Sequence, residues 1–218
     1  MKILVVADFH GNSNAEANLG KLLERGYDCL LMIGDLTNFG PLEAAESLLE
    51  TVRRHGVPSF AVPGNCDPKQ ILQLLEKYGV SLHGKCQSLG NMTFVGLGGS
   101  NITPFKTPFE LTEAEIREEL AAVACNISGQ WILATHTPPY GTALDIVNSG
   151  SHVGSKSIRE YVELKQPTVV ACGHVHEARG IDVLGNTMMV NPGPISKGLA
   201  AEIRINGNTR PEIELLQI

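Results

Sequence analysis

The sequence predicts an α/β layered fold made of short buried strands and intervening helices. Brief apolar, β-branched runs alternate along the chain with segments in which apolar residues recur at the helical period. The chain has 218 residues, of which 43% are hydrophobic and 18% are charged, a composition typical of globular proteins. It shows no internal repeat, low-complexity segment or linker. We therefore expect one domain that spans residues 1–218.

In the first half of the chain, strands and helices follow one another closely. The expected strands are residues 3–7, 29–33 and 59–62, and the expected helices are residues 13–25, 42–55 and 68–78. Pro41 suits the first turn of the helix over 42–55, and Gly56 suits its end. Pro63-Gly64 closes the third strand.

The second half is less regular and is expected to be richer in strands. The expected strands are residues 93–97, 131–135, 168–172, 181–184, 187–190, 200–205 and 212–216. Thr112 and Glu115 form a capping-box pattern that starts a helix reaching to about residue 125. A long loop over 138–154 leads to a helix over 155–164. Gly185-Asn186 predicts a tight hairpin between two of the late strands.

Charge and cysteine content narrow the function classes. The formal net charge is −6, and no run of Lys or Arg exceeds Arg53-Arg54, so a nucleic-acid-binding surface is disfavoured. The apolar stretch over 3–7 is too short for a secretory signal, and no stretch is long enough for a membrane helix. Five cysteines without a C-x-x-C pair predict a reducing compartment and no structural disulfides. We therefore expect a cytoplasmic protein.

Side chains that can bind metal ions follow five of the expected strands. They belong to Asp8, His10, Asp35, Asn65, His136, His174 and His176. In open α/β sheets ligands bind beyond the carboxyl ends of the strands, so residues far apart in sequence converge there. Two carboxylates, four imidazoles and one amide oxygen exceed the needs of one tetrahedral zinc ion. Nitrogen and oxygen ligands favour Mn, Fe, Zn, Ni or Co, and a pair of such ions activates water at a phosphoryl group.

Taken one at a time, these residues have ordinary structural explanations. An aspartate after a strand is most often a helix N-cap, and a single loop histidine is most often solvated. Asn65, before Cys66-Asp67-Pro68, also suits a turn. Seven such residues at five strand ends favour a metal site over these alternatives.

The ordered motifs resemble those of the calcineurin-like metallophosphoesterase superfamily. They are D-x-H at Asp8, G-D at Asp35, G-N-x-D at Asn65, the lone His136 and G-H-x-H at His174. Thr137-Pro138-Pro139, the loop that follows to residue 154, and His176-Glu177 resemble the small phosphodiesterase branch. The resemblance covers most of the chain and implies a four-layer αββα sandwich with mixed sheets.

The resemblance also implies a dinuclear mechanism. It assigns Asp8, His10 and His176 to a first metal ion, Asn65, His136 and His174 to a second, and Asp35 to a bridge between them. In the family, a metal-bridging water or hydroxide attacks phosphorus in line with the leaving alcohol. The expected activity is that of a phosphodiesterase rather than a monoesterase, with Mn as the first choice of metal and Fe, Zn, Ni or Co as alternatives.

One position departs from the family pattern. The family's G-N-H-[DE] motif usually carries a histidine after the asparagine, thought to contact the phosphate and protonate the leaving group, whereas here Cys66 precedes Asp67. A thiol, with a pKa of about 8.5, is a weak donor. We therefore expect Cys66 and Asp67 at the catalytic centre, and a preference for leaving groups that need little protonation. A small neutral filler at Cys66 is the alternative. Asn12 is a candidate phosphate contact, although N-capping of the first helix is the favoured interpretation.

Two further function classes stay open. One is a non-catalytic binding or scaffold module on the same fold, as in the retromer subunit that resembles these enzymes. The other is a DNA-repair nuclease, which would add a capping domain and basic surfaces that this short acidic chain lacks. The expected partner is a small phosphodiester or phosphoester substrate, without a membrane or nucleic acid, and a homo-oligomer is left open.

Overall fold

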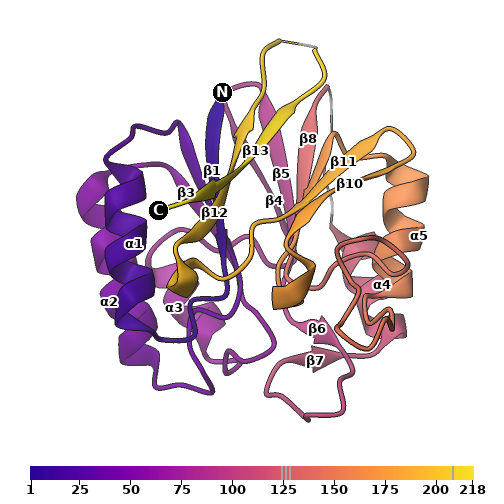
Figure 1. Ribbon diagram of the computed structural model, residues 1–218, viewed down its shortest axis with the longest axis horizontal. Coiled ribbons are helices and arrows are strands. Elements are labelled where there is room, and N and C mark those ends of the chain that lie inside the picture. Colours follow the sequence, from indigo (N-terminus) through magenta and orange to yellow (C-terminus); the bar gives the residue numbers. More distant parts are fainter. Residues whose placement is uncertain (124, 126, 128, 208) are drawn as a thin grey trace.

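In a computed structural model that describes residues 1–123, 125, 127, 129–207 and 209–218, two β-sheets face one another and helices cover the outer side of each (Figure 1). The helices are α1 (Ser13–Leu23), α2 (Leu42–His55), α3 (Ile71–Lys77), α4 (Glu113–Ala122) and α5 (Lys156–Lys165). The long strands of the first half are β1 (Lys2–Ala7), β2 (Cys29–Ile33), β3 (Ser59–Val62), β4 (Lys85–Leu89) and β5 (Met92–Leu97). Those of the second half are β8 (Trp131–Thr135), β9 (Val169–Ala171), β10 (Gly180–Leu184), β11 (Thr187–Asn191), β12 (Leu199–Arg204) and β13 (Glu212–Gln217).

Both sheets are mixed, with parallel strands at their centres. The first sheet has the order β13-β12-β1-β2-β3, in which β1, β2 and β3 are parallel. The second has the order β10-β11-β9-β8-β5-β4, in which β11, β9, β8 and β5 are parallel. The short strands β6 (Ser100–Asn101) and β7 (Glu110–Leu111) pair with each other and flank a loop at the lower edge of Figure 1.

Three hydrophobic cores separate four layers. One core packs α1 and α2 against the outer face of the first sheet, through residues such as Leu19 and Leu49. A second lies between the sheets and includes Ile3 and Phe94. The third packs α4 and α5 on the outer face of the second sheet. The αββα sandwich and its mixed sheets are therefore confirmed.

Most of the expected elements are found within two residues of their predicted bounds. The capping box is present, because the Thr112 hydroxyl accepts from the backbone N–H of Glu115 and the Glu115 carboxylate accepts from that of Thr112. The strand β4 is absent from the predicted elements. Two predicted helices are shorter than expected. The helix expected over 68–78 is limited to α3. The helix expected to reach residue 125 ends at Ala122, and residues 124, 126 and 128 lie outside the described part.

The prediction that the chain has no structural disulfide is wrong. Cys86, on β4, is bonded to Cys125 beyond α4, with their Cα atoms 5.8 Å apart. Spacing in the sequence cannot show such a pair, because β4 and the end of α4 meet only through the third core. Cys29 and Cys172 are free and buried. The expectation of a reducing, cytoplasmic location loses the support it drew from unpaired cysteines.

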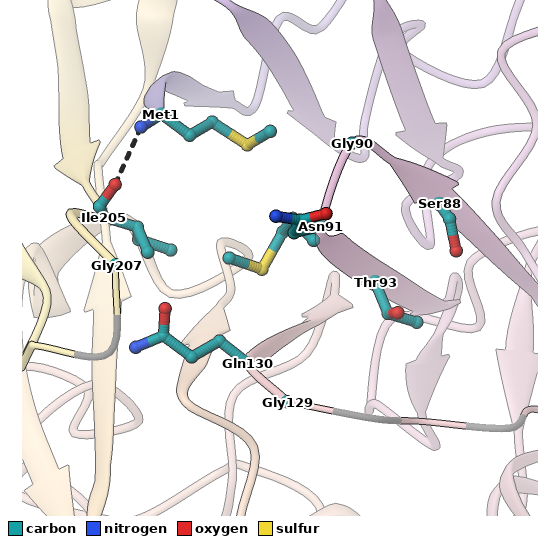
Figure 2. Close-up of a pocket in the computed structure, with 10 residues that line it drawn as sticks. Met1, Ser88, Gly90, Asn91, Thr93, Gly129, Gln130, Ile205 and Gly207 are labelled. Atoms are coloured by element: carbon teal, nitrogen blue, oxygen red, sulfur yellow. Dashed lines mark hydrogen bonds between the residues drawn. The ribbon is translucent and has the colours of Figure 1, made fainter.

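A pocket of about 630 Å³ opens at the amino ends of β1, β5 and β8 (Figure 2). Met1, Thr93 and Gln130 line it, and the amino group of Met1 donates to the carbonyl oxygen of Ile205 at 2.7 Å. It lies at the opposite end of the strands from the side chains that can bind metals. In the described part of the chain, no helix is long and apolar enough to cross a membrane.

Candidate metal centre

The seven predicted ligands follow the carboxyl ends of parallel strands from both sheets. Asp8, Asp35 and Asn65 come directly or within three residues after β1, β2 and β3 of the first sheet. His136 follows β8, and the G-H-x-H motif follows β9, in the second sheet. Because the two sheets face each other, these ends bring residues from the beginning and the end of the chain together.

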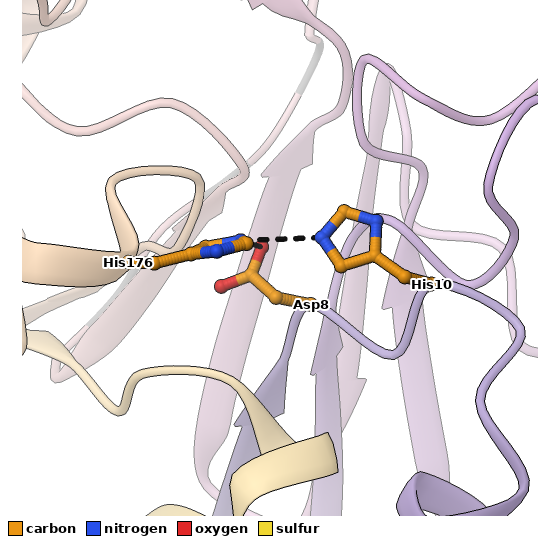
Figure 3. Close-up of side chains that lie close together, drawn as sticks. All are labelled: Asp8, His10 and His176. Atoms are coloured by element: carbon orange, nitrogen blue, oxygen red, sulfur yellow. Dashed lines mark hydrogen bonds and ion pairs between the residues drawn. The ribbon is translucent and has the colours of Figure 1, made fainter.

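The first cluster consists of Asp8, His10 and His176. Their ligand atoms all lie within 4.8 Å of one another. The two imidazoles point toward each other with an Nε2–Nε2 distance of 3.2 Å, and the Asp8 carboxylate lies beside them (Figure 3). His176 Nε2 is 3.7 Å from Asp8 Oδ1. Two imidazole nitrogens and one carboxylate oxygen that converge in this way suit a transition-metal ion.

Asp35 connects this cluster to the second one. Its Oδ2 lies 3.7 Å from His10 Nε2, and its Oδ1 lies 3.4 Å from His136 Nε2. The side chain is buried, and the backbone N–H of Cys66 donates to Oδ1 at 2.8 Å. Burial opposes ionisation, but the neighbouring His136 and His10 outweigh it and hold the pKa of Asp35 well below its usual range. Asp35 is therefore a carboxylate placed between two sets of imidazoles.

The second cluster is built around His136. Its Nδ1–H donates to the carbonyl oxygen of Ile33 at 2.9 Å, which leaves Nε2 3.0 Å from Asn65 Oδ1. Burial disfavours a charge here, but Asp35 overcomes it and raises the pKa of His136 to about 9. Because two oxygen acceptors face Nε2, this position favours a positive charge, which a proton or a metal ion can supply.

His174 packs against His136 at the side of the second cluster. Its ring meets that of His136 at a centroid distance of 5.1 Å, and its backbone N–H donates to Asp8 Oδ1 at 3.2 Å. Burial, reinforced by the nearby His136, lowers the pKa of His174 to about 4, so its imidazole is neutral and free to act as a ligand. The other oxygen of Asp8, Oδ2, is buried without a hydrogen-bond partner among the described residues. An unpartnered buried carboxylate oxygen is costly unless a cation or water meets it.

The backbone is strained at four of the seven predicted ligands. Asp8, His10, Asp35 and His174 have φ angles of 58°, 50°, 52° and 68°, in the left-handed region that residues with a side chain rarely adopt. Such conformations persist only where the surroundings impose them, and they concentrate at functional sites.

Two glycines allow the strand ends to approach one another. A Cβ atom on Gly34, whose φ is 79°, would collide with the imidazole of His136. One on Gly64 would collide with the carboxylate of Asp35. Both positions therefore need the absence of a side chain, and Gly34 also needs the conformational freedom of glycine.

The remaining predicted residues lie at different distances from this centre. The thiol of Cys66 is within 4.8 Å of the ligand atoms of His10 and Asp35, and burial together with Asp35 raises its pKa, so it is a neutral thiol. Asp67 is fully buried and accepts hydrogen bonds from the backbone of Gly64, Leu36 and Thr37. It thus ties the turn after β2 to the turn after β3. The oxygen of Asn12 accepts from Asn14 N at 2.8 Å and caps α1, which is the favoured interpretation of that residue.

One contact of the site involves a residue that no sequence motif marks. The amide Nδ2 of Asn65 donates to Thr107 Oγ1 at 3.1 Å. Thr107 belongs to the loop between β6 and β7, and a lone threonine in a loop carries no pattern from which this contact could be predicted.

The donor set fits a pair of divalent transition-metal ions. Imidazole nitrogens and carboxylate oxygens converge in two adjoining groups, one of Asp8, His10 and His176 and one of Asp8, Asp35 and His136, and Asp35 also lies beside His10. The amide oxygen of Asn65 adjoins the second group at His136. The unpartnered Asp8 Oδ2 and the two facing Nε2 atoms of His10 and His176 are both satisfied when cations lie among them.

Known proteins are similar to this chain in sequence and in fold. A family model described as the calcineurin-like phosphoesterase superfamily domain matches residues 1–204. An uncharacterized protein of Methanocaldococcus jannaschii is 42% identical over 201 residues, which cover 90% of this chain and 89% of that protein. A solved structure from Thermus thermophilus has a TM-score of 0.74 at 18% identity, over 99% of this chain and 98% of that one. A dimetal phosphatase from Danio rerio has a TM-score of 0.60 at 9% identity, with 98% of each chain covered. These two structures are similar to this chain in fold.

Proposed function

Because the chain belongs to the calcineurin-like phosphoesterase superfamily, we propose that it hydrolyses phosphate esters with two divalent metal ions, and that its substrates are phosphodiesters. The observation that carries the proposal is the pair of ligand clusters that share the buried carboxylate of Asp35. Asp8, His10 and His176 would hold one ion, and Asn65, His136 and His174 the other. When bound, the ions would activate water and offset the negative charge of the phosphoryl group.

The chain's own residues would orient and hold these ligands. The carbonyl oxygen of Ile33 fixes the tautomer of His136, since the Nδ1–H must donate to it and Nε2 is left to face the centre. Asp67 holds the two turns that carry Asp35 and Asn65 in register. This second layer of contacts keeps the ligand atoms in place before a substrate arrives.

A preference for diesters is supported by the chemistry of Cys66. A neutral thiol stands where the family usually has an imidazole that can carry a positive charge and donate a proton. A phosphodiester has one negative charge fewer than a monoester dianion, so it depends less on such a group. The substrate that fits best is a diester whose leaving alcohol departs without strong protonation.

A metal-by-substrate screen tests this proposal. The purified chain would be stripped of metal and assayed with Mn, Fe, Ni, Co and Zn on an aryl phosphodiester and on the matching aryl monoester. We expect metal-dependent turnover that is faster on the diester, and an Asp35→Asn variant that loses at least about 100-fold. Absence of turnover with every metal would favour the non-catalytic binding module, and faster turnover of the monoester would contradict the diester preference.

A further inference from the structure

We propose that Thr107, held by Glu110, is a positioning residue that fixes the side-chain amide of Asn65 with its oxygen toward the second metal ion. This inference rests on the proposed function, since it concerns one ligand of the proposed centre. The inference gives a role to two residues that are not among the seven ligands, Thr107 and Glu110, both in the β6–β7 region. An amide oxygen can bind a metal ion, whereas the NH2 group on the other side of the same amide cannot. The orientation of the Asn65 amide therefore decides whether the second cluster is complete.

A series of hydrogen bonds connects the carboxylate of Glu110 to the candidate metal centre. Thr107 Oγ1 donates to Glu110 Oε1 at 2.7 Å, and the backbone N–H of Thr107 donates to the same oxygen at 2.9 Å. Asn65 Nδ2 then donates to Thr107 Oγ1 at 3.1 Å. At the far end, Asn65 Oδ1 lies 3.0 Å from His136 Nε2. Each of these contacts joins either two side chains, or a side chain and the backbone of the loop between β6 and β7.

The direction of each hydrogen bond follows from the number of protons available. A threonine hydroxyl has one proton, and a carboxylate can only accept. Burial works against ionisation of Glu110, but its bonds from Thr103 and Thr107 outweigh burial and lower its pKa, so it is a carboxylate near neutral pH. The Thr107 proton is thus committed to Glu110, and its oxygen can only accept from Asn65. The NH2 group must face Thr107, and the amide oxygen must face the opposite side.

The loop itself is anchored to Asn65 independently of this hydroxyl. The backbone N–H of Phe109 donates to the carbonyl oxygen of Asn65 at 3.1 Å, and the backbone N–H of Ser100 donates to the carbonyl oxygen of Phe109 at 3.1 Å. Loss of the Thr107 hydroxyl should therefore leave the loop attached. What it removes is the nearer of two acceptors for the Asn65 NH2 group, and the only oxygen of the two, since the other acceptor is Cys66 Sγ at 3.6 Å.

Substitutions at Thr107 give the direct test. Valine has the shape of threonine without the hydroxyl, and serine keeps the hydroxyl. Thr103→Val is the matched control, because Thr103 also donates to Glu110 but does not contact Asn65. Binding of Mn ions would be measured by calorimetric titration, with thermal unfolding in chelator as a check on folding. We expect two ions in the unsubstituted chain, with one of them bound at least about 10-fold more weakly in Thr107→Val. Thr107→Ser and Thr103→Val should stay within about 3-fold.

A double substitution separates orientation from simple packing. Aspartate at position 65 offers oxygen on both sides, so its orientation no longer matters. In an Asn65→Asp background, Thr107→Val should therefore cause no further loss of affinity, and the two effects should not add. Should the valine variant not fold, Thr107→Ala gives the same measurements with less bulk.

The possible results separate the positioning role of Thr107 from the proposed dinuclear metal centre on which it rests. If the unsubstituted chain binds two ions and Thr107→Val binds both with unchanged affinity, the inference is overturned and the metal centre stands. The same holds if Thr103→Val weakens the ion as much as Thr107→Val does. If the unsubstituted chain binds fewer than two ions, the proposed dinuclear centre is contradicted, and the inference falls with it.

Discussion

At the scale of single residues, Cys66 is where the chain departs from its family. Its thiol lies among the ligand atoms of His10 and Asp35, and its raised pKa keeps it uncharged. A neutral thiol can fill space next to the phosphoryl group, but it is a poor proton donor for a departing alkoxide. The choice of residue at this one position should therefore affect alkyl and aryl leaving groups differently.

The first prediction concerns Cys66→His. An imidazole there could protonate the leaving group, so kcat on an alkyl phosphodiester should rise by at least about 10-fold. An aryl diester, whose leaving group departs without help, should change by less than about 3-fold. Cys66→Ser is the control, because a hydroxyl is also neutral. Parallel changes on the two substrates in the histidine variant would show that Cys66 does not set the leaving-group range.

The second prediction concerns the stability contributed by His83. Burial, with a smaller effect of Lys69, lowers the pKa of His83 to about 4, while Nδ1 accepts from Gly98 N and Nε2 lies 3.4 Å from Glu119. The unfolded chain, with a pKa near 6.5, takes up a proton at higher pH than the folded chain does. Stability from this group is therefore complete above about pH 6.5 and is lost between about pH 6.5 and 4, by at most about 3 kcal/mol.

Chemical unfolding of the original chain and of His83→Gln at several values of pH between 4 and 7.5 would measure this contribution. Other carboxylates titrate in the same window, so the quantity of interest is the difference between the two chains. The original chain should lose more stability than the glutamine variant as the pH falls to 4. Equal losses would mean that His83 is protonated as readily in the folded state as in the unfolded one.

At the scale of elements, the strands whose side chains are buried are the ones that the sequence predicts. Strands β1, β2 and β8 are buried along nearly their whole length and stand out as continuous apolar runs. Strand β4 has partly exposed side chains at the edge of its sheet, and its sequence, Lys85–Leu89, lacks any such run. The candidate metal ligands could be predicted because they follow strands that the sequence itself predicts. Thr107 and the Cys86–Cys125 bond were not, because both depend on contacts between elements distant in sequence.

The third prediction concerns the link between two turns. Asp67 accepts from Gly64 N and Leu36 N, and from both the N–H and the hydroxyl of Thr37, at 2.7 to 3.1 Å. In Asp67→Asn an NH2 group would face some of these donors, and the bonds to a charged acceptor would be lost. We expect a loss of about 3 kcal/mol in unfolding free energy, together with weaker binding of both metal ions.

Denaturant unfolding and metal titration would be carried out on the same samples. Asp28→Asn is the control, since Asp28 also accepts from a backbone N–H, that of Lys2, but lies at the other end of the strands. It should change stability by less than about 1 kcal/mol and leave metal binding as it was. A stable Asp67→Asn chain with normal metal affinity would show that the two turns hold their positions without the carboxylate.

At the scale of the whole molecule, the candidate centre joins the two sheets. Asp8, His10, Asp35 and Asn65 follow strands of the first sheet, and His136, His174 and His176 follow strands of the second. A metal ion shared by ligands from both sheets binds the folded chain and not the unfolded one, so it stabilises the sandwich by mass action. The fourth prediction follows: removal of the metal ions should lower the melting temperature.

An ion present at 100 times its dissociation constant contributes about 2.7 kcal/mol, which for a domain of this length corresponds to about 5–10 °C in melting temperature. Calorimetric scans with saturating Mn, with chelator, and with Mn restored would measure the shift and its reversal. An Asp8→Asn chain should show a smaller shift, because it loses a charged ligand from the cluster with His10 and His176. If the unsubstituted chain melted at the same temperature in all three conditions, the folded chain would bind no metal ion, and the proposed metal centre would be contradicted.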